Sequence, residues 1–363
     1  MTSHMTTAVQ PVSGDVRSAC ALASGACSGR DPGGGFAPLT DRFGRRHTYL
    51  RISLTDRCNL RCRYCMPAEG IPYRPRAELL SFEEITRVVR LGARMGIRKL
   101  RLTGGEPTMR AELPELVATL SAIEGLDSIG LTTNGLMLER LAVPLRAAGL
   151  THLNVSLDTL RPERFERMTR RPGLQRVLAG IEAGLAAGFE AIKLNTVVIA
   201  GENDDELEAF AKLAMERPLY VRFIEYMPFR GNGWSAAHML PSGELLARLR
   251  RRWPLQPSGE DGPHAVVRSY RAPGFAGSIG FISSMTEHFC DGCNRIRLTA
   301  DGAVKSCLFQ AAEVSLRDAM RSGADDAELA LLMHRALSGK WARHPSAEQL
   351  VDGQGRAMTQ IGG

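Results

Sequence analysis

The sequence predicts an α/β fold in which repeated strand–helix units form a parallel sheet shaped as a partial barrel. From residue 48 onward, short β-branched apolar segments alternate with amphipathic helical segments, which is the pattern of βα units. Polar groups such as "TGGEP" and "TTNG" directly follow strand segments, and ligands of α/β proteins bind at that edge of the sheet. Six units are too few for a complete eight-stranded barrel. An incomplete barrel of about six units is therefore favoured, and a doubly wound sheet is the alternative.

The elements alternate strictly along this part of the chain. The predicted strands cover residues 48–54, 98–104, 128–135, 152–158, 191–199 and 220–228. The predicted helices between them cover residues 82–96, 113–123, 137–149, 174–188 and 204–216. Ser81 is followed three residues later by Glu84, a capping-box pair that marks the start of the first helix.

The two ends of the chain depart from this rhythm. After about residue 240 the sequence predicts a helix over residues 240–253, a hairpin turn at "TADG" and two helices near residues 313–338. We therefore expect a barrel over residues 46–240 and a smaller α+β region over residues 241–363. Residues 1–45 are rich in Ala, Gly and Ser. They are expected to form a disordered extension, with a cleaved targeting segment as the alternative.

The composition is that of an ordinary globular protein. The chain has 363 residues, 44% of them hydrophobic, and a formal net charge of +7, which suggests an anionic partner. It has no run of eighteen apolar residues, so no transmembrane helix is expected. Its eight cysteines are clustered rather than spread. Clustering favours metal binding in a reducing cytoplasm over a disulfide scaffold.

The first cluster is Cys58, Cys62 and Cys65, which follow the first strand at C-x3-C-x2-C spacing. A structural zinc site or a cubic iron–sulfur cluster normally has four protein ligands. Three thiolates on a 4Fe–4S cluster leave one iron with an open position, the arrangement of a catalytic centre. The sequence therefore predicts a catalytic cluster, and a zinc loop lacking one ligand is the alternative.

The second cluster is Cys290, Cys293 and Cys307, at C-x2-C-x13-C spacing. A cysteine pair followed by a hairpin and a further cysteine is the outline of a zinc ribbon, for which His288 could help supply ligands. No residue near Cys307 partners it locally. A second 4Fe–4S cluster with an open iron is therefore favoured over the ribbon.

Several motifs carry a family resemblance. The first triad, with Tyr64 between its last two cysteines, and "TGGEP" after the second strand resemble the radical S-adenosylmethionine (SAM) superfamily. There SAM occupies the open iron and is cleaved to a 5′-deoxyadenosyl radical. Both triads, "LTTNG", "NVSLD", "KLNTVV", "RFIEYMP" and "CNRIRLTADG" together resemble the GTP 3′,8-cyclase family. The similarity runs from about residue 40 to the terminal "IGG".

The resemblance implies roles for individual residues. The implied cofactors are SAM and two 4Fe–4S clusters, held by the two cysteine triads. The implied SAM contacts are Tyr64, Gly105, Ser156 and Met227. The implied GTP contacts are Arg51, Arg101, Thr132, Lys193, Arg222, Arg295, Ile296 and Arg297. The terminal Gly362 and Gly363 would enter the active site and assist the reaction.

The basic residues agree with a nucleotide triphosphate as ligand. They recur at the ends of predicted strands as Arg51, Lys99, Arg101, Lys193, Arg222, Arg295 and Arg297. If strand alternation holds, these side chains point into one cavity. Guanidinium groups bind phosphate oxygens in a bidentate way.

The family's activity is the conversion of GTP to (8S)-3′,8-cyclo-7,8-dihydroguanosine 5′-triphosphate, an early step of molybdenum cofactor biosynthesis. It implies an external electron donor, a downstream cyclic pyranopterin monophosphate synthase and a cytoplasmic location. A homodimer is an open expectation, and neither nucleic acid nor membrane is an expected partner. The alternatives are a peptide-modifying radical SAM maturase and a zinc-ribbon nucleic-acid-binding protein. The 6% aromatic content disfavours the latter, which needs stacking platforms among basic residues.

Overall fold

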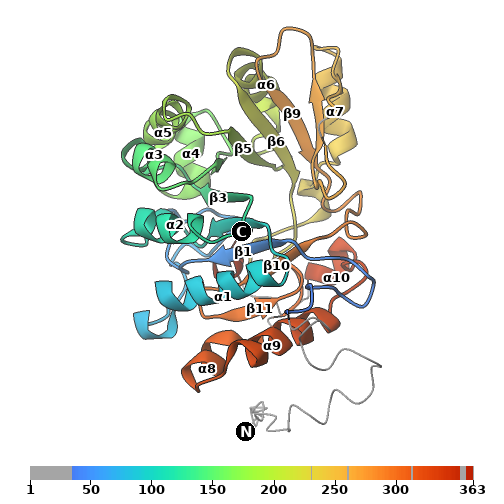
Figure 1. Ribbon diagram of the computed structural model, residues 1–363. Coiled ribbons are helices and arrows are strands. Elements are labelled where there is room, and N and C mark those ends of the chain that lie inside the picture. The colour runs from blue at the N-terminus through green and yellow to red at the C-terminus, as the bar shows by residue number, and fades with distance from the viewer. Residues whose placement is uncertain (1–34, 230, 260, 312–313, 352–356, 363) are drawn as a thin grey trace, which may run out of the picture.

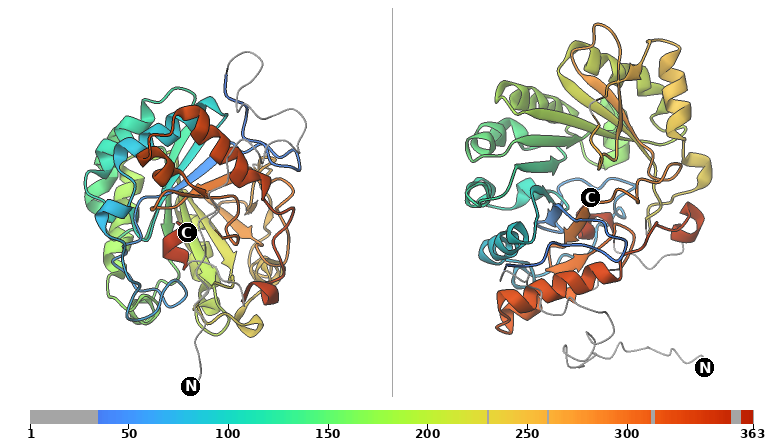
Figure 2. Two further views of the ribbon diagram at one scale, coloured as in Figure 1. Left: turned by 90° about the horizontal axis from the view of Figure 1, so that it is seen from below. Right: turned by 45° about the vertical axis from the view of Figure 1, so that its right-hand side comes forward.

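One twelve-stranded sheet curves around the interior of the protein, and helices cover its outer face (Figures 1 and 2). The computed structural model describes residues 35–363 except residues 230, 260, 312–313, 352–356 and 363. The strand order is β12-β11-β10-β1-β2-β3-β4-β5-β6-β9-β8-β7. Among the described residues, the end strands β12 and β7 do not pair with each other, so the barrel is open, as predicted.

The central six strands are parallel and confirm the predicted βα rhythm. They are β1 (Tyr49–Ser53), β2 (Lys99–Thr103), β3 (Ser128–Thr133), β4 (His152–Ser156), β5 (Ala191–Val198) and β6 (Leu219–Glu225). The helices are α1 (Phe82–Arg94), α2 (Leu113–Ser121), α3 (Leu138–Ala147), α4 (Pro162–Thr169), α5 (Leu174–Ala186) and α6 (Leu207–Glu216). Ser81 and Glu84 form the predicted capping box. Helix α4 was not predicted, because only Phe165 and Met168 give it an apolar face.

The C-terminal strands join the same sheet at both edges. β9 (Ser278–Ile282) pairs parallel with β6, and β10 (Arg295–Leu298) pairs parallel with β1. Antiparallel strands continue outward as β8 (Arg268–Arg271), β7 (Gln256–Pro257), β11 (Ala303–Lys305) and β12 (Val314–Ser315). Six strands alone would leave the backbone groups of β1 and β6 unpaired at two open edges. The C-terminal region satisfies both edges, and a boundary near residue 240 stays a prediction.

Helices complete the C-terminal region. They are α7 (Ser242–Arg250), α8 (Leu316–Arg321), α9 (Asp326–Ser338), α10 (Ala347–Val351) and α11 (Met358–Ile361). The predicted hairpin is confirmed, since β10 and β11 are antiparallel and Gly302 has a φ of 80° in the turn between them. No helix in the described part of the chain is long and apolar enough to span a membrane.

The prediction of disorder through residue 45 is wrong for its last ten residues. Leu39 is only 1% exposed, and its N–H donates to Met95 O at 3.0 Å. Asp41 is buried and accepts bonds from Arg45 and His47. The polar, glycine-rich composition of this segment did not reveal that Leu39 and Asp41 hold it to the rest of the protein. Residues 1–34, with Cys20 and Cys27, lie outside the described residues.

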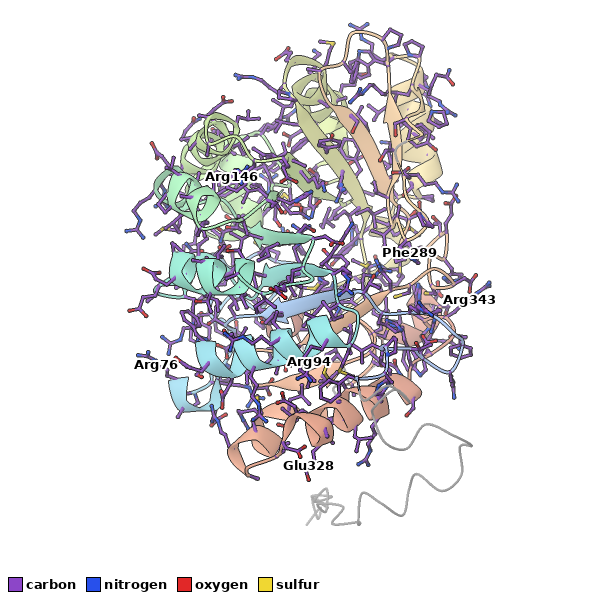
Figure 3. The ribbon with its side chains drawn as sticks, in the orientation of Figure 1. Arg76, Arg94, Arg146, Phe289, Glu328 and Arg343 are labelled. Carbon is purple, nitrogen blue, oxygen red and sulfur yellow. The ribbon has the colours of Figure 1, made fainter. Side chains whose placement is uncertain are left out.

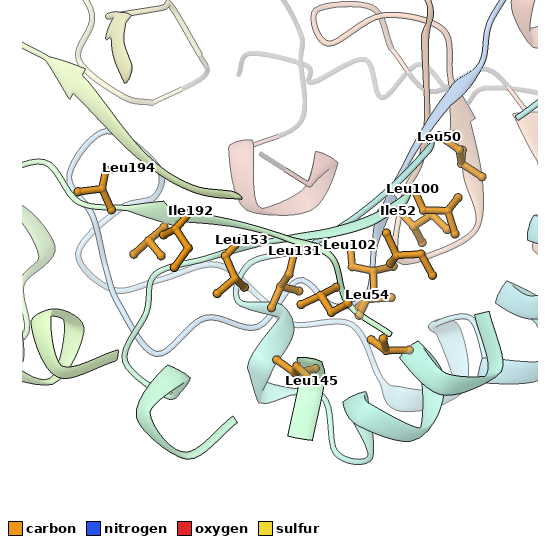
Figure 4. Close-up of a cluster of buried hydrophobic side chains, with 14 of the residues drawn as sticks. Leu50, Ile52, Leu54, Leu100, Leu102, Leu131, Leu145, Leu153, Ile192 and Leu194 are labelled. Carbon is orange, nitrogen blue, oxygen red and sulfur yellow. The ribbon is translucent and has the colours of Figure 1, made fainter. Parts of the chain in front are cut away.

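Alternation along the strands separates the core from the barrel interior. Leu50, Ile52, Leu100, Leu102, Leu131, Leu153, Ile192 and Leu194 belong to one buried apolar cluster between sheet and helices (Figure 4). The residues between them in sequence, such as Arg51, Arg101 and Lys193, face the opposite side of the sheet. The same pattern that buries the core therefore places basic side chains inside the barrel.

Candidate active site

The first cysteine triad lies in the loop after β1. Cys58, Cys62 and Cys65 are each half-buried. The N–H of Leu60 donates to Cys58 Sγ at 3.4 Å, and Asn134 Nδ2 lies 4.0 Å from the same sulfur. Burial raises the pKa of the Cys58 thiol to about 11, and it also raises the pKa of Cys62 and Cys65. A bound metal cation would stabilise the thiolate forms of these three neighbouring cysteines at neutral pH.

The residues predicted to contact SAM all lie at the carboxyl edge of the sheet. Tyr64 donates from its hydroxyl to Asp158 Oδ2 at 2.5 Å, which ties the cysteine loop to the end of β4. Gly105 packs on the cysteine loop so tightly that a Cβ there would lie 2.4 Å from Arg57 O. Ser156 is the last residue of β4, and Met227 follows β6. These positions come from four different strands, as a shared ligand site requires.

The second cysteine triad surrounds its own cavity of about 130 Å³. Cys290 and Cys293 precede β10, and Cys307 follows β11. Burial alone would raise the pKa of Cys293, but the positive charges of Arg295 and Lys340 lower it to about 6. This thiol is therefore prepared to serve as a thiolate ligand.

Neither cysteine triad is a compact single-ion group among the described residues. Among the described residues, one group is compact enough for a single metal ion: His288, Cys290 and His344, whose ligand atoms lie within 4.8 Å of one another. Neither complete triad forms such a group. Three thiols are the donor set that a 4Fe–4S cluster with an open iron would need.

Basic side chains line a cavity of about 820 Å³ inside the barrel. The sequence-predicted members that line it are Arg51, Lys99, Arg101, Lys193, Arg222 and Arg295. Their predicted place at strand ends is wrong for Arg51, Arg101 and Arg222, which lie mid-strand. Lys99 and Arg295 do lie at strand ends, because each begins its strand. Alternation predicts the face of the sheet that a side chain occupies, but it does not give its height along the barrel.

The remaining predicted GTP residues occupy different surroundings. Ile296 is fully buried in the apolar core, so only its backbone could contact a ligand. Thr132 lies in β3 with a buried hydroxyl that has no hydrogen-bond partner among the described residues. Arg297 lines the cavity of the second triad, and Arg295 lines that cavity and the large basic one. Arg295 therefore joins the two cavities.

Arg101 is held across the floor of the basic cavity. Its Nε donates to Tyr49 Oη at 3.0 Å and its Nη1 donates to Asn154 Oδ1 at 3.0 Å. The guanidinium crosses Gly130, where a Cβ would lie 2.4 Å from Arg101 Nη1. Burial and the neighbouring charges of Arg222, Arg101 and Lys99 lower the pKa of Lys193 to about 7. Asp127, Glu190 and Asp261 also line the cavity but are outnumbered by its cations. A polyanion would relieve the remaining positive charge.

The C-terminal tail enters the barrel, as Figure 2 shows (left). Ile361 is buried, and Gly362 O accepts a hydrogen bond from Arg297. A Cβ at Gly362 would lie 2.3 Å from Thr103 Oγ1, so the tail passes where a side chain does not fit. Gly363 lies outside the described residues.

Sequence reasoning missed the residues that support the site. Glu106 is buried and accepts from the side chains of Thr108 and Thr133 and from the N–H of Asn134. Lys340 donates from Nζ to Arg295 O at 3.1 Å beside the second triad. Glu106 lies inside the "TGGEP" motif, and a carboxyl directly after a strand was its available signal. Lys340 lies in a C-terminal segment with no motif, so nothing in the sequence marked it.

The fold and the cysteine loop define a protein of radical SAM type. A family model described as "Radical SAM superfamily" matches residues 52–214, and one described as "Molybdenum Cofactor Synthesis C" matches residues 219–346. A Moorella thermoacetica protein named "GTP 3′,8-cyclase" is 46% identical over 90% of this chain and 100% of its own length. The chain therefore belongs to the GTP 3′,8-cyclase family.

Two further comparisons show how far the family assignment extends. The Drosophila melanogaster "Molybdenum cofactor biosynthesis protein 1" is 51% identical over 86% of this chain but only 55% of its own length. The chain thus spans about half the length of such relatives. The crystal structure of Streptococcus suis SuiB bound to S-adenosylmethionine covers 77% of this chain and 67% of SuiB with a TM-score of 0.54 and 13% identity. At that identity it supports the fold alone.

Proposed function

We propose that this protein converts GTP to (8S)-3′,8-cyclo-7,8-dihydroguanosine 5′-triphosphate by radical SAM chemistry, an early step of molybdenum cofactor biosynthesis. The observation that carries this proposal is the position of Arg295, which lines both the basic cavity and the cavity of the second cysteine triad. A ligand with a polyanionic end and a metal-binding end could occupy both. The names of the relatives point to GTP as that ligand.

The first triad would hold the SAM-cleaving 4Fe–4S cluster. SAM would lie among Tyr64, Gly105, Ser156 and Met227, at the carboxyl edge of the sheet. When bound, the cluster and SAM supply a 5′-deoxyadenosyl radical, which is the part of the chemistry that amino acids cannot perform. The chain's share is to shape this site. Gly105 lets the cysteine loop pack directly on the turn after β2, and Asp158 fixes Tyr64 through the tyrosine hydroxyl.

The substrate would be held at its two ends. Arg51, Arg101, Lys193 and Arg222 would bind the triphosphate, each charge-assisted contact contributing about 1.5–3 kcal/mol. Cys290, Cys293 and Cys307 would hold a second 4Fe–4S cluster beside the guanine, with Arg295, Arg297 and Thr132 between the two ends. Anchoring both ends fixes the ribose C3′ relative to the base C8. Such intramolecular alignment can lower a barrier by roughly 7–11 kcal/mol.

The tail would assist the reaction from within the barrel. Gly362 reaches Arg297, one of the residues assigned to GTP, and Gly363 would extend the tail further. The remaining expectations are proposals as well. They are an external electron donor, a downstream cyclic pyranopterin monophosphate synthase, a possible homodimer and a cytoplasmic location.

The test is an anaerobic incubation with dithionite, SAM and GTP deuterated at the ribose 3′ carbon. Loss of the 3′ hydrogen, closure of the C3′–C8 bond and gain of one electron and one proton leave a product isomeric with GTP. We expect this isomer, together with 5′-deoxyadenosine that carries one deuterium. Deuterium-free 5′-deoxyadenosine would show that the abstraction site is wrong. About eight irons per chain support two clusters, whereas bound zinc supports the ribbon alternative.

A further inference from the structure

A groove of about 870 Å³ lies beside the first cysteine loop, separate from the two cavities assigned above. Its walls come from the start of the cysteine loop, the turn after β2, the segment before α1 and the end of α8. Thr55, Arg57, Arg76, Phe82, Met109 and Arg110 are among its lining residues. None of its lining residues lines the basic cavity or the cavity of the second triad.

The groove carries a surplus of positive charge. Four arginines line it, and Arg57 and Arg76 are exposed and form no ion pair with any described residue. Arg76 lies at the edge of the molecule near the start of α1 (Figure 3). Arg321 is neutralised by Glu84. Two exposed glutamates, Glu83 and Glu112, oppose the remaining charge only in part.

The floor of the groove is rigid and partly apolar. Arg110 donates to Leu54 O and to Leu80 O, both at 2.8 Å, and its guanidinium lies 4.8 Å from the Phe82 ring centroid. Met109 is 47% exposed at the same wall. An exposed apolar side chain in the same groove as several cations fits a protein-docking surface.

The groove also lies against the backbone that carries the first triad. Arg57 directly precedes Cys58, and Arg57 O accepts the N–H of Glu106 at 2.7 Å. Tyr73 is 37% exposed, with the guanidinium of Arg57 5.7 Å from its ring centroid. A protein seated here would therefore contact the residue next to a cluster ligand.

We propose that this groove docks an acidic protein that carries one electron at a time. The inference rests on the proposed function, because SAM cleavage consumes an external electron. The reduced carrier would lose one electron, and the 4Fe–4S cluster proposed at Cys58, Cys62 and Cys65 would gain it. No covalent bond in either protein changes. Charge complementarity identifies the occupant, since redox encounters use small interfaces steered by charge.

The first test measures docking directly. An acidic 2Fe–2S ferredoxin in its oxidised state is the probe, and its association with the holoenzyme is followed at low and high salt. We expect the ferredoxin to associate with Arg76→Glu at least about tenfold more slowly than with wild type at low salt. It should associate with Glu83→Gln faster than with wild type. Arg140→Glu reverses an exposed charge on α3 and should match wild type. Equal association of Arg76→Glu and Arg140→Glu would overturn the proposal.

The second test separates docking from chemistry. With dithionite as reductant, Arg76→Glu should form 5′-deoxyadenosine at the wild-type rate, because no docking is needed. With the reduced ferredoxin as reductant, it should be at least about tenfold slower. Equal losses with both reductants would contradict docking at this groove. If wild type forms no 5′-deoxyadenosine with dithionite, the proposed function fails, and the binding measurement still decides the groove.

Discussion

Arg297 Nη1 donates a hydrogen bond to Gly362 O at 3.3 Å, across a separation of 65 residues. The bond fastens the penultimate residue of the chain to β10 inside the barrel. Gly362 has a φ of 73°, a left-handed conformation that glycine adopts without strain. Thr103 and Ser53 approach so closely that no side chain fits there. The tail is therefore positioned by backbone geometry and by one arginine.

Gly362→Ala should lower cyclisation by about 100-fold, because displacement of a positioned group by about 1 Å has an effect of that size. Product formation per iron-loaded chain is the measurement. The atoms nearest to the added Cβ belong to Thr103 and Ser53 and not to a cysteine, so iron content should stay at the wild-type level.

Gly323→Ala is the matched control. Gly323 also has a positive φ, 91°, but a Cβ added there would meet no atom within 4 Å. It reproduces the backbone strain without the clash. If both variants retain wild-type turnover, the tail has no part in the reaction.

Gly130→Ala should weaken GTP binding although the substituted residue is not itself a predicted GTP ligand. The new methyl group would displace the Arg101 guanidinium, which crosses Gly130 to reach Asn154. Loss of one charge-assisted contact of about 1.5–3 kcal/mol corresponds to roughly 10- to 150-fold in affinity. Calorimetric titration with GTP measures it. Gly243→Ala, which meets no atom within 4 Å, should bind as wild type does; similar losses in both variants would argue against the positioning of Arg101.

Local sequence patterns predicted the strands, most of the helices and the basic side chains that point into the barrel. Period-two alternation flanks Arg51 with Leu50 and Ile52, and this alone assigns Arg51 to the interior. What failed depended on distant partners. The pairing of β9 and β10 with opposite edges of the sheet is set by unsatisfied strand edges, which no local pattern encodes. The anchoring of Leu39 against α1 likewise requires the folded helix to be in place.

The same distinction applies to the site. Cysteine spacing predicted which thiols group together, because the members of each triad are close in sequence; their role as cluster ligands stays a prediction. The bond from Tyr64 to Asp158 spans 94 residues, and the place of Lys340 beside Cys293 arises only in the folded chain. Residues that support a site through long-range contacts leave little trace in a single sequence.

GTP binding should weaken as the pH rises above 7. Burial and the charges of Arg222, Arg101 and Lys99 lower the pKa of free Lys193 to about 7. A bound triphosphate supplies negative charge and raises that pKa, so binding takes up a proton at pH 8. The affinity should fall by up to about tenfold per pH unit until the pKa of the bound state is reached.

Calorimetry in buffers of different ionisation enthalpy measures this proton uptake. Tyr49, which is buried but has its pKa lowered to about 8 by Arg101 and Arg51, adds uptake in the same direction at higher pH. Lys193→Met should remove the proton uptake that sets in near pH 7, the pKa of free Lys193. Titration of the GTP phosphates is common to both proteins, so the difference between them is diagnostic. Equal uptake by wild type and Lys193→Met at pH 8 would refute the role of Lys193.

Glu225→Gln should loosen the proposed second metal site through the backbone that leads to its cysteines. Glu225, at the end of β6, is fully buried and accepts from the N–H groups of Ser242 at 2.9 Å, Met285 at 2.7 Å and Thr286 at 3.0 Å. Glutamine replaces one of these acceptor oxygens with a donor, so a buried N–H loses its partner. Each such loss costs about 1–3 kcal/mol.

Urea unfolding should show that decrease in stability, and iron analysis should show preferential loss from the second site. Met285 and Thr286 belong to the segment that continues to Cys290, whereas the first triad lies in the loop after β1 and is supported by Glu106 and Asn134. Glu216→Gln, at an exposed position at the end of α6, should change neither quantity. If Glu225→Gln loses iron equally from both sites, its effect is global unfolding, and the link from β6 to the second triad is not the cause.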